Sequence, residues 1–395
     1  MFDTDETLAA APPQLEPHDF EKLQEVLKSE GPLSAADWLC AKLESNQDYP
    51  ALFYALLMKK RIELGISPFP AGPSSDIPRE YHEAYEEAIR TAGRKVGELF
   101  LAKNDFPRAW TYFNMLGETQ LIVDALEKYE PGPEENIQPL IEVALYHQVN
   151  IPRGFDLIVD RYGICNAITT YSGFDFSKNL PARQHCIQKL VRSLHAQLVE
   201  RIRNDLETRG ETVPAGASIP IMLEGREYLF EDGAYHIDTS HLNSIVEFSL
   251  HLENCPELNL ASELALYGSR LSGSFQNQMD PPFENSYADY KVYLDILRGV
   301  DVEAGLKHFR DKIDPAFSEE FTLPAEIYVN LLLRLGRMDE ARAIAKKYLS
   351  EVQGRQMACP GVYELCLQVK DFQGLSDAAR SRADGVSFLA ALASQ

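Results

Sequence analysis

Apolar residues recur at intervals of three and four along nearly the whole chain after residue 18, a spacing that is typical of amphipathic helices. The clearest such segment covers about 182–208. Its apolar positions are Ile187, Leu190, Val191, Leu194, Leu198, Ile202 and Leu206. Because side chains share one face of a helix at this spacing and one face of a strand at a spacing of two, the sequence predicts an all-α fold.

Glycine and proline interrupt this helical pattern at 67–75, 210–238 and 272–285. In the second interval, Glu224-Gly225 and Asp232-Gly233 are turn dipeptides between short apolar runs. They predict one small β-hairpin near 219–237, with two short helices as an equally compatible alternative.

The interruptions also predict the domain organisation. Residues 1–18 combine acidic residues with three prolines and are expected to be a disordered acidic tail. An N-terminal helical body over 19–271 follows, then a loop over 272–289 and a C-terminal array of helical hairpins over 290–395.

One pattern recurs along the chain: an apolar helix, a short polar turn and a second helix that begins with small or apolar residues. Residues 96–113 and 327–344 are the clearest instances. Weaker instances cover 290–309, 362–379 and the pair 240–252 and 257–271.

This pattern resembles the tetratricopeptide-repeat superfamily. In that family, small residues in both helices let them pack closely, and a large apolar residue completes the contact. Gly97, Phe100, Ala109 and Phe113 match at the expected spacing within a hairpin near 89–118.

A second unit matches in part. Gly336, Asp339, Glu340 and Ala341 fit the turn and the start of the second helix, whereas Val329 is larger and Ala345 smaller than the family usually has. The intervals between units are also irregular. The resemblance therefore implies an irregular α-solenoid of helical hairpins that is TPR-like (tetratricopeptide-repeat-like). The alternative is an ordinary helical domain with antiparallel hairpins, which has the same local pattern.

The charge of the chain limits its partners. The 395 residues include 38 Lys and Arg and 60 Asp and Glu, a formal net charge of −22. Nucleic-acid affinity depends on Lys and Arg replacing counterions, and anionic membrane surfaces repel acidic proteins. The sequence therefore predicts neither a nucleic-acid partner nor a membrane partner, and favours partners with a basic segment.

The N-terminus lacks a signal peptide, and no stretch of 18 apolar residues occurs. Six cysteines form no CxxC pair and are expected to be reduced core thiols. Both features predict a cytoplasmic protein. Cys165 lies four residues after Arg161, but its apolar flanks favour a buried core thiol over a reactive one.

The motifs of common nucleotide enzymes, serine hydrolases and zincin-type metalloproteases are missing. The densest polar segment is 235–242, where His236, Asp238 and His241 are candidate metal ligands. A fourth ligand would come from elsewhere, for example His147, His185 or His195. The alternative, which we favour, is that Asp238 or Thr239 caps a helix.

The aromatic group of the 272–289 region is a second candidate. Its rings, next to acidic residues, either form a partner-binding loop or anchor a long connection, and the second is favoured. The rings belong to Phe275, Phe283, Tyr287, Tyr290 and Tyr293.

These features together predict a non-enzymatic scaffold or adaptor that binds a protein or peptide, without a cofactor. The alternative is an enzyme or metal-binding protein centred on His236, Asp238 and His241. The pathway, the oligomeric state and the binding-surface residues do not follow from the sequence.

Overall fold

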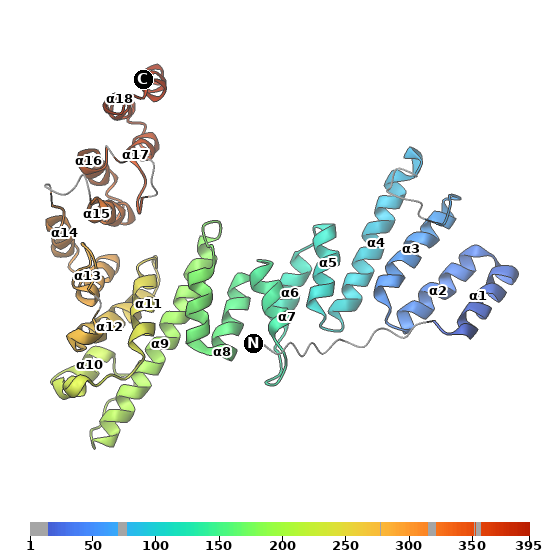
Figure 1. Ribbon diagram of the computed structural model, residues 1–395, viewed down its shortest axis with the longest axis horizontal. Helices are drawn as coiled ribbons and strands as arrows, with labels where there is room; N and C mark the ends of the chain where they lie inside the picture. Colours follow the sequence, from blue (N-terminus) through green and yellow to red (C-terminus); the bar gives the residue numbers. More distant parts are fainter. Residues whose placement is uncertain (1–14, 70–76, 277, 315–320, 351, 353–356) are drawn as a thin grey trace. The chain divides into compact units, whose positions relative to one another are not determined.

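The computed structural model describes residues 15–69, 77–276, 278–314, 321–350, 352 and 357–395. The regular secondary structure of these residues is helical, and Figure 1 shows the helices in chain order from blue to red. Among them, the one β contact is an isolated antiparallel bridge between Gln278 and Asn285. The predicted all-α class is therefore confirmed.

The chain divides into two compact units, residues 1–158 and residues 159–395. The division lies inside α8 (Ile151–Gly173) and therefore within the N-terminal body predicted over 19–271. Gly163 has non-helical backbone angles (φ 80°, ψ 175°), so α8 consists of two helical parts joined by this residue.

In the first unit, consecutive helices from α1 to α6 contact each other in chain order. The elements are α1 (Pro17–Glu30), α2 (Pro32–Ser45), α3 (Tyr49–Glu63), the 3₁₀ turn η2 (Arg79–Tyr81), α4 (His82–Leu101), α5 (Phe106–Leu116), α6 (Gln120–Lys128), α7 (Gln138–Ile141) and the π-helical turn η3 (Glu142–Tyr146). Fully buried side chains such as Leu52, Val96 and Ile122 come from different helices, so the core lies between neighbouring helices.

In the second unit, α9 contacts α10, α11 and α12, and the helices from α11 to α19 contact each other in chain order. The elements are α9 (Leu180–Thr208), α10 (Ile219–Leu223), η4 (Glu227–Gly233), α11 (Thr239–Ser249), α12 (Glu257–Arg270), η5 (Gly273–Phe275), α13 (Ser286–Leu297), α14 (Val302–Asp311), α15 (Leu323–Arg334), α16 (Met338–Tyr348), α17 (Val362–Gln368), α18 (Phe372–Ser381) and α19 (Gly385–Ala393). All seven apolar positions predicted for 182–208 are buried on α9.

Each helix–turn–helix segment that the sequence predicts contains two helices in mutual contact, including α4 with α5 and α15 with α16. At the α4–α5 contact, a Cβ added to Gly97 would lie 2.8 Å from ring carbons of Phe113. Ala109 and Phe113 are fully buried there. A small residue therefore allows this close approach, as expected from the sequence.

Four helix pairs are joined by one kind of turn, in which a residue of positive φ precedes an aspartate. The turns are Gln47-Asp48, Asn104-Asp105, Lys370-Asp371 and Ala383-Asp384. Each aspartate N–H donates to a carbonyl five residues earlier, at 2.8–3.0 Å, which closes the preceding helix. Each aspartate side chain then accepts an N–H in the first turn of the next helix. One short segment thus ends one helix and begins another.

The β-hairpin predicted near 219–237 is wrong, because this segment forms α10 and the 3₁₀ helix η4. Gly225 and Gly233 have φ of 68° and 75°. Met222 and Leu229 are completely buried, and α10 packs against α12 and α9. Glu224-Gly225 therefore follows α10, and Asp232-Gly233 forms the end of η4, which agrees with the alternative of two short helices.

The two predicted non-helical regions are shorter than expected. Residues 1–14 of the predicted acidic tail lie outside the described residues, and α1 begins at Pro17, inside the predicted 1–18 range. In the predicted loop 272–289, η5 covers Gly273–Phe275 and α13 already begins at Ser286.

Candidate functional site

Asp238 begins α11 as its N-cap. Its Oδ1 accepts the backbone N–H groups of Ser240 (2.8 Å) and His241 (3.2 Å), and the Ser240 hydroxyl (2.5 Å). The hydrogen bonds from Ser240 and His241 lower the pKa of this carboxyl. An N-cap satisfies backbone donors that lack an intrahelical partner, so the carboxylate has a structural role at the start of α11.

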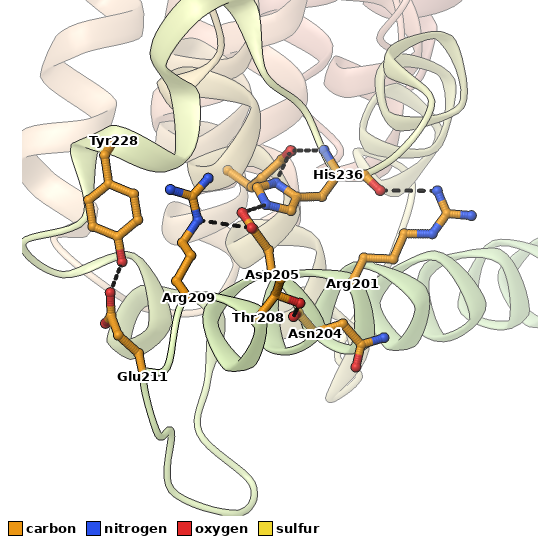
Figure 2. A network of polar contacts seen from close by, with 9 residues as sticks. Arg201, Asn204, Asp205, Thr208, Arg209, Glu211, Tyr228 and His236 are labelled. Carbon is orange, nitrogen blue, oxygen red and sulfur yellow. Dashed lines mark hydrogen bonds and ion pairs between the residues drawn. The ribbon is translucent and has the colours of Figure 1, made fainter.

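His236 lies between two other side chains, as Figure 2 shows in part. Its Nε2 is 3.3 Å from Oδ2 of Asp205 on α9, and its Nδ1 is 3.0 Å from the hydroxyl of Tyr267 on α12. The backbone N–H of His236 donates to the same hydroxyl (2.7 Å). The imidazole therefore joins two helices that are distant in the chain.

The protonation states follow from these contacts. Burial would raise the pKa of Asp205, but hydrogen bonds from Arg209 and His236 lower it, so the carboxylate accepts. Burial lowers the pKa of His236 and raises that of Tyr267 to about 12. A neutral imidazole has one N–H. Nε2–H therefore donates to Asp205, and Nδ1 accepts the Tyr267 hydroxyl proton.

The network extends along the C-terminal end of α9. Arg209 donates from Nε to Oδ1 of Asp205 (2.9 Å), and its guanidinium lies 5.0 Å from the ring centroid of Tyr228. The Tyr228 hydroxyl donates to Glu211, which also accepts Nε–H of Arg226 (2.7 Å). These bonds lower the pKa of Glu211. The contacts fasten η4 and the end of α9 to each other.

Arg201 completes the network in Figure 2 by donating to the backbone carbonyl of His236 (3.0 Å). Within this network both ring nitrogens of His236 have partners, and the Tyr267 hydroxyl both donates and accepts. A metal ligand needs a free lone pair, and a general base needs a position beside its substrate. The arrangement therefore orients the segment before α11 and leaves its imidazole no nitrogen for a metal.

The histidines considered as further metal ligands, His147, His185 and His195, do not complete a metal site with His236. Among the described residues, no group of three or more His, Cys, Asp and Glu side chains is placed to hold a metal ion. His195 pairs with Glu263 (2.9 Å), and His147 lies in the first unit, 3.9 Å from Glu142. His185 belongs to α9, and His241 is half-buried in the first turn of α11.

The cysteines are free thiols, of which four are buried: Cys40, Cys186, Cys359 and Cys366. Burial raises the pKa of Cys40, Cys255 and Cys366, which disfavours the reactive thiolate. The expectation of a buried thiol is wrong for Cys165, which is exposed on α8. Its apolar neighbours in sequence point in other directions around the helix.

Four of the five aromatic residues singled out for the 272–289 region are buried, namely Phe283, Tyr287, Tyr290 and Tyr293, whereas Phe275 is half-buried beside Tyr235. Phe283 lies 4.9 Å from Tyr290 and 5.8 Å from Phe309, measured between ring centroids. Tyr287 is completely buried against Gly268, where an added Cβ would overlap its ring. These rings anchor the connection between α12 and α13, which is the role favoured from the sequence.

A surface hollow beside the turn between α11 and α12 has no counterpart among the sequence predictions. Its lining residues are Leu180, Pro181, Arg183, Gln184, His251, Glu253 and Asn254. An adjoining hollow shares Glu253 and Asn254 and adds Leu297, Leu333, Arg334 and Leu335. Because these residues come from α9, α13, α15 and one turn, no local spacing in the sequence brings them together.

Two arginines influence this surface. Arg334 donates to the carbonyls of Leu250 (2.5 Å) and Leu252 at the end of α11, and to the hydroxyl of Tyr293 (3.2 Å). Partial burial, together with Arg183 and Arg334, lowers the pKa of His251 to about 4. The imidazole is therefore neutral at pH 7, between two cationic side chains.

Comparison with protein-family models, with curated proteins and with solved structures gave no match for this chain.

Proposed function

We propose that this protein is a non-catalytic scaffold, an irregular TPR-like α-solenoid of helical hairpins that binds a protein or peptide partner. The observation that carries this proposal is the close helix contact made through a glycine. It occurs at Gly97 with Phe113 between α4 and α5, and at Gly268 with Tyr287 between α12 and α13. Stacked hairpins of this kind create extended surfaces suited to peptides and proteins.

The recurring turn supports the same proposal. In both units, an aspartate at the turn closes one helix and caps the next, as at Asp105 and Asp371. Each added repeat of such a unit enlarges the surface that a partner can contact. Repetition of the unit does not by itself bring catalytic side chains together.

The alternative, an enzyme or metal-binding protein centred on His236, Asp238 and His241, gains no support from the contacts of these residues. His236 bonds to Asp205 and Tyr267, and Asp238 caps α11. Elemental analysis of protein purified without a histidine tag tests the alternative directly. Stoichiometric zinc, iron or manganese would revive it.

The scaffold proposal is tested by affinity purification of the tagged full chain from its native lysate, with quantitative mass spectrometry and an empty-tag control. We expect a near-stoichiometric partner that forms a complex with the purified chain on size-exclusion chromatography. Recovery of the chain alone would contradict the proposal.

We also infer a cytoplasmic location. The six cysteines are free thiols, which is typical of reducing compartments. Among the described residues, no helix has the length and apolar character that crossing a bilayer requires. Subcellular fractionation with an antibody to the chain tests the location.

A further inference from the structure

Arg183 forms no ion pair within the part of the chain that the structure describes. It lies in the first turns of α9 and lines the hollow beside the α11–α12 turn. Its side chain forms no hydrogen bond or ion pair with a described residue. By contrast, Arg192 on the same helix pairs with Glu257 at 2.6 Å. The chain has a net charge of −22, so acidic residues are plentiful and an arginine in a hollow without an ion-pair partner is unexpected.

Arg334 adds a second positive charge. Its hydrogen-bond partners are two backbone carbonyls and a tyrosine hydroxyl, and among the described residues it forms no ion pair with a carboxylate. Arg183 and Arg334 both act on His251, because each disfavours its protonated form. The three side chains come from α9, α15 and the α11–α12 turn, and the two arginines contribute the positive charge of this surface.

The remaining lining residues define what else a ligand would meet. Leu180 and Pro181 lie beside Arg183, and Leu180 is 55% exposed. Glu253 lines both hollows, and the negative charge of its carboxylate disfavours the binding of an anion. Asn254 supplies an uncharged polar group, whereas the Gln184 amide already bonds to the backbone N–H and carbonyl of Glu253.

We propose that this hollow binds a carboxylate or phosphate group carried by the scaffold's partner, with Arg183 as the charged donor and His251 as a second donor. The inference rests on the proposed function, since it names the chemistry of the partner's contact. Arg334 contributes charge while it holds the end of α11. A guanidinium presents several N–H donors in a plane that suits both kinds of oxyanion.

The hollow is tested without any partner, by NMR of the full chain labelled at histidine Cε1. Inorganic phosphate is titrated at low ionic strength and pH 6.5. We expect saturable shifts of the His251 resonance and an upward shift of its pKa, because a bound anion offsets Arg183 and Arg334. Glu253 also lines the hollow, and Glu253→Gln should tighten phosphate binding several-fold, because it removes a negative charge near the anion.

Arg183→Gln should weaken phosphate binding about tenfold or more, as expected for the loss of a charged hydrogen bond. Arg203→Gln is the matched control, since Arg203 lies on α9 but lines neither hollow. No saturable shift of His251, or equal weakening by both variants, would overturn the inference.

The source of the anion is tested with two acetylated peptides that differ only in glutamate or phosphoserine at one position. Tighter binding of either one supports the inference and identifies the group. The amount of partner captured from the lysate is then compared between the Arg183→Gln and Arg203→Gln variants. Equal capture by both would overturn the inference while the scaffold proposal stands. Phosphate binding without any captured partner would overturn the scaffold proposal, and with it the claim that a partner carries the anion.

Discussion

The ring of Phe113 in α5 lies against the backbone of Gly97 in α4, so closely that a Cβ on Gly97 would come within 2.8 Å of two ring carbons. Both residues are buried, and Phe113 is completely so. Real Cβ atoms do not approach ring carbons to this distance without displacing them. The contact therefore sets how closely the two helices approach.

Gly97→Leu should lower the free energy of unfolding by about 3 kcal/mol, because the added side chain forces α4 and α5 apart. Chemical denaturation followed by circular dichroism measures the loss. The control is Gly173→Leu, since a Cβ on Gly173 meets no atom within 4 Å. Equal stability of both variants would show that the α4–α5 contact tolerates a larger residue.

The cap at Asp238 is testable by substitution. Asp238→Ala should lower stability by about 1 kcal/mol, because the N–H groups of Ser240 and His241 lose their acceptor. Asp238→Asn should retain most of the stability, since its amide oxygen also accepts. If Asp238 were instead a metal ligand, both substitutions would release bound metal. Such a loss would argue for the alternative function.

Arg334 holds the end of α11 through the carbonyls of Leu250 and Leu252. Arg334→Lys should lower the free energy of unfolding by about 1–3 kcal/mol, because an ammonium cannot reproduce the planar set of donors. Amide hydrogen exchange should also accelerate near residue 250. Arg310→Lys, at an exposed position on α14, is the control and should change stability by less than about 0.5 kcal/mol.

Acid should destabilise the second unit through two histidines. The pKa of His251 in the folded chain is about 4, and burial also lowers that of His236, from an ordinary value of 6.5. Between pH 6.5 and 4 the unfolded chain therefore binds more protons than the folded chain, so stability falls as the pH falls through this window. The stability is fully present above pH 6.5.

Denaturation at pH 7.5, 6 and 5 measures this dependence. His251→Gln should reduce the slope, because glutamine does not titrate. Asp205 affects stability at lower pH. Because its pKa is lowered in the folded chain, its contribution to the free energy of unfolding is lost only as the pH falls through about 4 and below. A wild-type slope unchanged by His251→Gln would mean that the imidazole is solvated as in the unfolded chain.

Local spacing predicted the helices because each depends on residues a few positions apart. The α9 stripe from Ile187 to Leu206 is buried as expected, and the cap at Asp238 follows from residue type and position. The hairpin near 219–237 was mispredicted for a related reason. A glycine of positive φ, such as Gly225, serves equally well after a short helix and between two strands, and packing against α12 decides between them.

The all-helical class, most of the helix positions and the glycine contact between α4 and α5 follow from residue spacing and side-chain size along the chain. The pairing of polar groups depends on how the helices pack. Asp205 and Tyr267 reach His236 from two different helices, and Arg183 and Arg334 approach His251 from two others. Such contacts cannot be read from a short segment, because packing is a property of the whole unit.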